Sequence, residues 1–219
     1  MTDVQEIAQL RTALLQMWVR AENMVRQAVR SVMERDAQMG RAVIAMDEDV
    51  DSMEVELDRR CLSILARGTH DAEQLRFVTA VMKMVTDLER IGDLAVNVSE
   101  RGFDLVIGRG VEPSPDLAIM GDLVADMVRD AADAFVARDA VAALELRERD
   151  KDVDAMNRAA FAQGLAILSA HPDQADRALS LTNISKHLER IGDHAVSLAE
   201  MVFFVVDGTD VRHRPSPVV

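Results

Sequence analysis

The sequence has a single cysteine, no tyrosine and one tryptophan, and aromatic residues make up only 3% of its 219 residues. The lone Cys61 excludes an intramolecular disulfide and is typical of a reducing compartment. With so few aromatic side chains, the core must consist of Leu, Val, Ile, Ala and the thirteen Met residues. Such a core favours packed helices over sheets, in which aromatic and β-branched residues are enriched.

Long apolar runs and an excess of positive charge are absent as well. The apolar run at 201–206 is far shorter than the roughly 20 residues that a membrane-spanning helix needs. The first ten residues show no basic segment followed by an apolar one, so we expect no signal peptide. A net charge of −13 repels phosphate backbones, which argues against nucleic-acid binding. We therefore expect a cytoplasmic protein, and a peripheral location at the inner face of the membrane stays open.

Three blocks of sequence occur twice in the same order. Residues 24–37 and 127–140 are identical at seven of fourteen positions, at an offset of 103. The hexapeptide Leu-Glu-Arg-Ile-Gly-Asp occurs at 88–93 and again at 188–193, at an offset of 100. Such internal similarity indicates a duplicated unit. Pro113 and Pro115 lie between the copies and indicate a boundary, because proline interrupts helices.

Each copy has the apolar periodicity of three long helices. Apolar residues recur at intervals of three and four, as on the buried face of a helix. Asp36 and Asp139 each stand where they would cap the second helix of their copy. Short connections imply antiparallel neighbours, so we predict an all-α fold of two tandem up-down-up three-helix bundles. The predicted ranges are a first bundle at 1–110, a linker at 111–116, a second bundle at 117–210 and a flexible tail at 211–219.

Pairs of acidic residues four positions apart occur at equivalent places in both copies. Residues i and i+4 lie on one face of a helix, so two such pairs on facing helices would bring four carboxylates together. Like charges at that separation oppose folding unless a cation lies between them. Carboxylate oxygens suit magnesium, manganese, calcium or iron better than structural zinc. The candidate ligands are Asp47, Asp51, Glu89 and Asp93 in the first copy and Asp150, Asp154, Glu189 and Asp193 in the second.

The glycine inside each hexapeptide supports a special role for this segment. Gly92 and Gly192 would each cost a helix about 1 kcal/mol relative to alanine, so we interpret them as points of close helix approach or of a tight site. The first copy extends its acidic face through Glu54 and Asp58, where the second has Asn157 and Phe161. We therefore expect the first site to hold more ions, or to hold them more tightly.

Less specific interpretations exist for these residues. Acidic pairs are common on solvated helix faces, and Arg90 would ordinarily pair with a nearby carboxylate. His187 and His194 are ligand candidates, but ordinary exposed or hydrogen-bonded histidines are more frequent. Cys61 fits a small buried residue and Trp18 a core or interface anchor. A metal-free helical adaptor and a carboxylate-bridged metalloenzyme remain as alternatives. The second is disfavoured because no Glu is followed three residues later by His.

With the Asp-x-x-x-Asp pairs at 47/51 and 150/154, the duplicated hexapeptide resembles the PhoU family of phosphate-signalling regulators over nearly the whole chain. The resemblance implies tandem three-helix bundles whose acidic pairs bind multinuclear clusters, of iron or zinc among other metals. It also implies a non-enzymatic negative regulator of phosphate uptake and of the phosphate-starvation response. Such a regulator couples the ATPase subunit of the phosphate ABC transporter to a membrane sensor histidine kinase. Independently, the Met-rich stripes suggest a homodimer.

Overall fold

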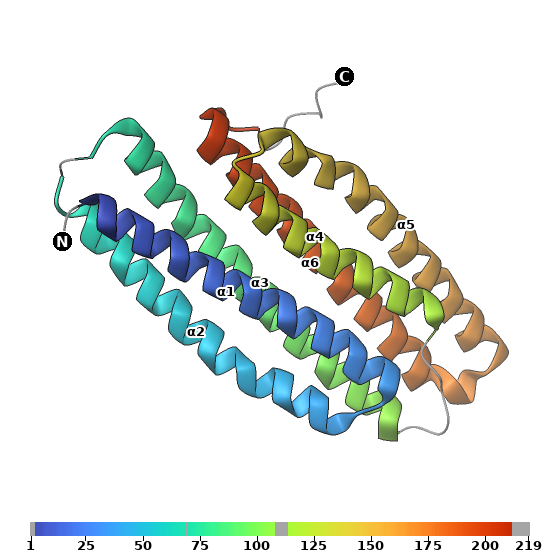
Figure 1. Ribbon diagram of the computed structural model, residues 1–219. Helices are drawn as coiled ribbons and strands as arrows, with labels where there is room; N and C mark the ends of the chain where they lie inside the picture. The colour runs from blue at the N-terminus through green and yellow to red at the C-terminus, as the bar shows by residue number, and fades with distance from the viewer. Residues whose placement is uncertain (1–2, 69, 108–113, 212–219) are drawn as a thin grey trace.

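The computed structural model describes residues 3–68, 70–107 and 114–211, and throughout these ranges every regular element is helical. The first copy forms α1, α2 and α3, and the second forms α4, α5 and α6 (Figure 1). A short 3₁₀ turn precedes the last helix. The bounds are α1 Asp3–Glu34, α2 Ala37–Leu65, α3 Ala72–Ile107, α4 Pro115–Ala137, α5 Ala140–Ala170, η1 Pro172–Gln174 and α6 Ala175–Asp207. The predicted fold, two three-helix bundles in tandem, is confirmed.

The second helix of each copy begins at the predicted aspartate. Asp36 caps α2 and Asp139 caps α5, each with a carboxylate that accepts hydrogen bonds from the backbone amides two and three residues later. The backbone turns sharply just before both caps, because Arg35 and Arg138 adopt left-handed conformations, with φ of 55° and 54°. Both connections are therefore too short for anything but antiparallel neighbours.

Two predicted boundaries differ from the structure. The linker was placed at 111–116, but α4 already begins at Pro115, with Ser114 as its N-cap. Proline is favourable in the first turn of a helix because its missing N–H has no intrahelical partner there, so Pro115 starts a helix rather than stopping one. Val211, assigned to the tail, is buried, and its carbonyl accepts a hydrogen bond of 2.7 Å from Arg147. Residues 212–219 of the predicted tail lie outside the described residues.

The two bundles lie side by side and share one hydrophobic core, in which α1 contacts α4 and α3 contacts α6 (Figure 1). Trp18 of α1 is 1% exposed and donates its indole N–H to the carbonyl of Val128 in α4 at 2.9 Å. Its ring centroid lies 5.8 Å from that of Phe135. Trp18 is thus an anchor between the bundles.

The repeat position of Trp18 is occupied in the second copy by Gly121. A Cβ atom on Gly121 would lie only 2.5 Å from a methyl carbon of Val29 in α1. The contact between α1 and α4 therefore uses the largest side chain on one helix and the smallest residue on the other. A bulky residue at both positions would force the helices apart. The two copies differ here because they pack against each other.

A second contact joins α3 to α6 beside the hexapeptides. His194 Nδ1 lies 2.9 Å from Asp87 Oδ1, and both side chains are largely buried. Within the described part of the chain, no helix combines the length and the apolar character needed to cross a bilayer. The long helices instead place their most similar segments, the two hexapeptides, in the middle of the molecule.

Candidate functional site: two carboxylate clusters

The first carboxylate cluster consists of Asp47 and Asp51 on α2 with Glu89 and Asp93 on α3. The apolar neighbours of these residues fix their direction. Val50 of α2 and Leu88 and Ile91 of α3 are fully buried, so the acidic residues beside them emerge at the edge of the α2–α3 contact. The second carboxylate cluster occupies the corresponding edge between α5 and α6. It consists of Asp150, Asp154, Glu189 and Asp193.

The hexapeptide glycines bring the facing helices together at these edges. A Cβ atom on Gly92 would lie 3.2 Å from Asp47 Oδ1 and 3.4 Å from Val50. A Cβ atom on Gly192 would lie at the same two distances from Asp150 Oδ1 and Val153. The predicted close approach is confirmed in both copies. Because the glycine offers no side chain, the aspartate of the neighbouring helix lies directly against the α3 or α6 backbone.

Burial makes the first carboxylate cluster costly to ionise. Burial raises the pKa of Asp47 to about 6, and the charges of Asp51 and Asp93 raise it further. Burial and the charge of Asp93 also raise the pKa of Glu89 to about 7, against an opposing effect of Arg90. Asp47 Oδ1 and Glu89 Oε2 are buried and accept no hydrogen bond. Both oxygens therefore lack the hydrogen-bond donors that buried carboxylates ordinarily require.

The second carboxylate cluster shows the same electrostatics. Burial raises the pKa of Asp150 to about 6, and the charges of Asp193, Asp154 and Glu189 add to the shift. The pKa of Asp193 is raised as well, first by burial and then by Glu189. Asp150 Oδ1, like Asp47 Oδ1, is buried and accepts no hydrogen bond. The duplication has thus kept an unpartnered aspartate oxygen at the same place twice.

Cationic side chains occupy the outer edge of each cluster. Arg90 donates a hydrogen bond of 2.9 Å to Asp93, which confirms that this arginine pairs with a nearby carboxylate. Arg90 Nε also lies 3.4 Å from Glu89 Oε2. This contact is an ion pair without hydrogen-bond geometry, so Glu89 Oε2 accepts no hydrogen bond. Lys186 contacts both carboxylate oxygens of Glu189 at 2.6 Å. The spacing of three residues between Lys186 and Glu189 could have revealed this pair in the sequence.

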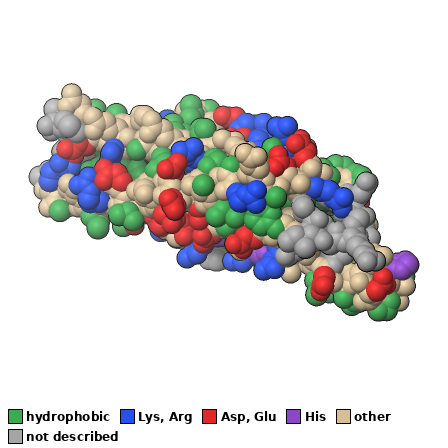
Figure 2. Space-filling view, turned by 90° about the horizontal axis from the view of Figure 1, so that it is seen from below, with side chains coloured by type: hydrophobic (Ala, Val, Ile, Leu, Met, Phe, Trp, Pro, Cys, Tyr) green, Lys and Arg blue, Asp and Glu red, His purple; other side chains and the backbone are tan. Residues whose placement is uncertain are grey.

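With Arg90 and Lys186 bound to carboxylates of the clusters, the acidic side chains do not converge on one position where a metal ion could bind. Within the described ranges, no group of three or more His, Cys, Asp or Glu side chains is positioned to hold a metal ion. The acidic residues nevertheless gather on one face. Figure 2 shows Asp and Glu side chains concentrated in the middle of the face seen from below, with Lys and Arg beside them. The helices bring the predicted ligands together as two facing pairs, and metal binding stays a prediction.

The two clusters differ at their margins, as the sequence suggested. The pKa of Glu54 is raised by burial and by Asp58, so the first cluster continues along α2 as an acidic stripe. At the positions of Asp58 and Asn97 the second copy has Phe161, which is 54% exposed, and Ser197, whose hydroxyl donates to a backbone carbonyl. Glu200 is held by Arg147 at 2.5 Å, an ion pair that is 15% and 11% exposed.

The remaining candidates have structural surroundings. His194 is paired with Asp87, and the pKa of His187 is lowered by burial and by the nearby Arg190 and Arg101. Cys61 is completely buried, and burial raises the pKa of its thiol to about 12, which leaves it protonated and unreactive. Sequence reasoning did not find the His194–Asp87 and Arg147–Glu200 pairs, because nothing in helical periodicity relates residues on different helices.

The fold and its two clusters define a duplicated six-helix protein with one carboxylate cluster on each three-helix unit. The family model described as "PhoU domain" matches residues 14–102 and again residues 117–202. The chain belongs to the PhoU family. A Pseudomonas putida protein named "Phosphate-specific transport system accessory protein PhoU homolog" is 37% identical over 95% of this chain and 82% of its own length. A relative of the same name from Zymomonas mobilis is 31% identical over 96% of this chain and 89% of its own.

Solved structures agree with this assignment. The crystal structure of PhoU from Pseudomonas aeruginosa superposes with a TM-score of 0.91 at 34% identity, over 95% of this chain and 100% of that one. The PhoU structure from Streptococcus pneumoniae gives a TM-score of 0.88 at 22% identity, over 96% and 99% of the two chains. The second comparison supports the fold alone.

Proposed function

We propose that this protein is a non-enzymatic negative regulator of phosphate uptake and of the phosphate-starvation response. In this proposal it binds the ATPase subunit of the phosphate ABC transporter on one surface and a sensor histidine kinase on another, so that uptake is reported as kinase inhibition. It would act in the cytoplasm, at the inner face of the membrane through these partners, and as a homodimer. The observation that carries the proposal is family membership over nearly the whole chain, with relatives named as accessory proteins of phosphate-specific transport.

A strain that lacks the gene tests this regulatory role. We expect phosphate-starvation transcripts to be high even in phosphate-rich medium and to return to the repressed level when the gene is restored. Unchanged transcription and unchanged phosphate uptake in the deletion strain would contradict the proposal.

We further propose that each carboxylate cluster binds metal ions, iron or zinc by resemblance and manganese or magnesium by ligand chemistry. The support comes from the clusters themselves. Asp47, Glu89 and Asp150 each have a buried carboxylate oxygen that accepts no hydrogen bond. Neighbouring acidic residues make it still more costly to ionise Asp47 and Asp150. A bound cation would supply the missing charge compensation. Arg90 and Lys186 would then exchange their present carboxylate contacts for solvent, and Asp93 and Glu189 would be free to turn inward.

Elemental analysis of protein purified without added metal tests the second proposal. We compare the wild type with a neutralised first cluster (Asp47→Asn, Asp51→Asn, Glu89→Gln, Asp93→Asn) and with the matching four changes in the second. A variant that neutralises four exposed carboxylates outside the clusters is the control for loss of four charges: Glu48→Gln, Asp133→Asn, Glu145→Gln and Asp152→Asn. We expect the cluster variants to lose metal and the control to keep it, with the larger loss from the first cluster.

A metal-free helical adaptor is the competing function, and one observation favours it. Arg90 and Lys186 already compensate part of the cluster charge, and no three potential ligands converge in the described ranges. Such an adaptor would use its acidic faces to meet basic partner surfaces. Wild-type protein without metal, together with full signalling by the neutralised first-cluster variant, would favour the adaptor.

A further inference from the structure

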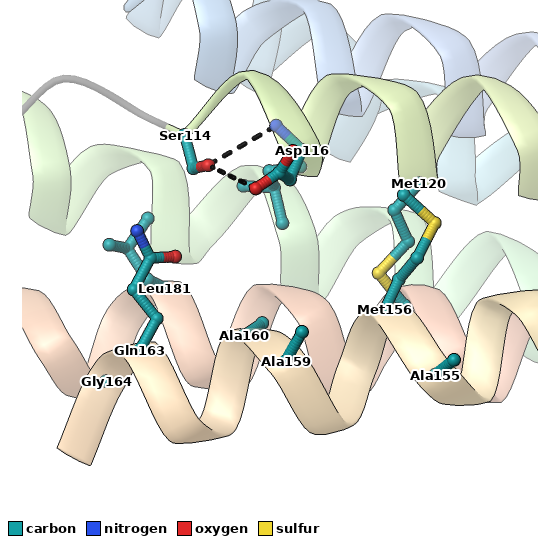
Figure 3. Close-up of a pocket in the computed structure, with 11 residues that line it drawn as sticks. Ser114, Asp116, Met120, Ala155, Met156, Ala159, Ala160, Gln163, Gly164 and Leu181 are labelled. Atoms are coloured by element: carbon teal, nitrogen blue, oxygen red, sulfur yellow. Dashed lines mark hydrogen bonds between the residues drawn. The ribbon is translucent and has the colours of Figure 1, made fainter. Parts of the chain in front are cut away.

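A groove of about 490 Å³ lies between the start of α4 and the second half of α5. Its floor is apolar and consists of small or flexible side chains, among them Ala159, Ala160 and Leu181. Figure 3 shows Met120 and Met156 pointing toward one another at one end, and Ser114 with Asp116 near the other. The groove belongs to neither carboxylate cluster and therefore needs an explanation of its own.

The first copy fills the corresponding place with its own chain. The second half of α2 buries Leu57, Cys61 and Ile64. The first turns of α1 lie beside the end of this segment, where Glu6 and Gln9 line one hollow together with Ile64. Glu6 pairs with Arg67 across the same contact. The covering segment is thus an amphipathic helical stretch that presents apolar side chains to α2 at intervals of three and four residues.

The second copy lacks this cover within α4. Its first residue, Pro115, stands at the repeat position of Thr12 when the offset is 103. The turns of α1 formed by residues 3–11 therefore have no counterpart in α4. Beyond Val153, the only buried residue of α5 is Gly164. Ala160 and Gly164 also stand where the first copy has Leu57 and Cys61. Among the described residues, the start of α4 at Pro115 and the two smaller residues of α5 leave the groove open.

The charge of the groove differs from that of its counterpart. The first copy places Arg59, Arg60 and Arg67 beside the acidic start of α1, whereas their repeat positions in the second copy are Ala162, Gln163 and Ala170. Among the residues that line the groove, Asp116 alone is charged. The chain as a whole carries −13. A segment that binds here should therefore be basic, unlike the acidic start of α1.

We propose that this groove receives an amphipathic, basic helix of another protein, which packs on α5 as the first turns of α1 pack on α2. Two or three apolar side chains, spaced by three and four residues, would lie on Ala159, Ala160 and Leu181. A lysine or arginine at the end of the helix would face Asp116. Such helix-in-groove recognition needs an apolar floor and a charged margin, and both are present. The inference is independent of metal binding and of any role in phosphate regulation.

A peptide copied from the first copy serves as the probe. It has the sequence of residues 3–15 with Asp3→Lys and Glu6→Lys, capped at both ends and labelled with fluorescein. Titration with the full-length protein should raise its fluorescence anisotropy to saturation. We expect the unsubstituted, acidic peptide to bind at least fivefold more weakly, and Asp116→Asn in the protein to reduce this preference.

Ala160→Leu is the variant that fills the groove, because the first copy has Leu57 at this position. We expect it to weaken binding of the basic peptide at least tenfold, while circular dichroism and the unfolding temperature stay at wild-type values. Ala162→Leu, an exposed position on the same helix outside the groove, is the matched control and should bind normally. Absence of saturable binding, or equal binding by the Ala160→Leu variant, would overturn the proposal. Sedimentation velocity tests a second copy of this chain as the occupant of the groove. If the wild type is a dimer and Ala160→Leu, but not Ala162→Leu, converts it to a monomer, the proposal is overturned.

Discussion

The two repeats are most alike where their helices meet at the carboxylate clusters, and they differ most where they meet other surfaces. A Cβ atom added to Gly92 or to Gly192 would meet the equivalent aspartate and valine of the facing helix at the same two distances. In contrast, Trp18 in one copy stands at the repeat position of Gly121 in the other. After a duplication, the contacts inside each unit repeat, but the contact between the units must fit two different helices together. Differences between the copies therefore mark surfaces that face something other than their own bundle.

The largest effect is expected at the contact between the bundles. Trp18→Ala should lower the free energy of unfolding by about 3–5 kcal/mol, because it leaves a large cavity and removes the indole hydrogen bond to the carbonyl of Val128. Urea denaturation measures this. Trp18→Phe keeps most of the buried ring and should cost clearly less. A loss below about 1 kcal/mol for Trp18→Ala would show that the shared core is not a major source of stability.

The two glycines provide the sharpest test of equivalence. Gly92→Val and Gly192→Val should each cost about 1–3 kcal/mol, because the new side chain meets Asp47 or Asp150 and pushes the facing helices apart. The measurement is again urea denaturation, with each variant compared with the other. Since the surrounding distances are the same, the two costs should agree closely. Unequal costs would mean that the two helix pairs differ in how far they can yield.

The carboxylate clusters predict a pH dependence of the metal-free protein. The pKa values of Asp47, Asp150 and Glu89 lie at about 6, 6 and 7 in the folded chain, above their ordinary values of 3.8, 3.8 and 4.5. The native state therefore binds more protons than the unfolded state between about pH 4 and 7. The free energy of unfolding should fall as pH rises through that window. Thermal unfolding in the presence of a chelator, from pH 4.5 to 8, measures this loss.

Neutral variants of the same aspartates provide the control for this pH dependence. Asp47→Asn and Asp150→Asn should each flatten the dependence, and to a similar degree, because burial raises the pKa of both aspartates to about 6. At pH 8, a metal that binds the clusters should restore stability to the wild type but less to these variants. If the metal-free wild-type protein becomes steadily more stable from pH 4.5 to 8, ionisation of the cluster carboxylates does not destabilise the fold, and the prediction is wrong.

The smallest effect is expected at an ion pair between the bundles. Arg26 of α1 donates a hydrogen bond of 2.8 Å to Asp126 of α4, and this contact lowers the pKa of Asp126. A lowered carboxylate pKa stabilises the fold above the unfolded-state pKa, and this stabilisation is lost as pH falls through the folded-state value. Because both side chains are partly exposed, Asp126→Asn should cost less than about 1 kcal/mol at pH 7. Urea denaturation at pH 7 and at pH 3 should show a smaller cost at the lower pH.

The helices and the residues that make up the two clusters could be predicted from the sequence. Apolar spacing predicted six helices, and Asp36 and Asp139 cap α2 and α5 as expected. Apolar periodicity and N-capping can both be recognised in the sequence because they depend only on residues within one or two turns. The facing of the acidic pairs also followed, since residues four apart share a helix face and short connections make neighbouring helices antiparallel. Pro115 was misjudged because proline interrupts a helix in its interior but favours its first turn.

By itself, then, the sequence determined the duplication, the all-helical fold and which carboxylates stand beside which glycine, because local spacing and a repeated motif encode these features. The tertiary structure alone decided that both bundles share a core through Trp18 and Gly121. It alone showed that Arg147 holds Glu200 and that the described residues form a groove between α4 and α5. These features depend on which helices pack against each other, and the helices concerned are far apart in the sequence. Helical periodicity relates only residues within the same helix, so it does not predict these contacts.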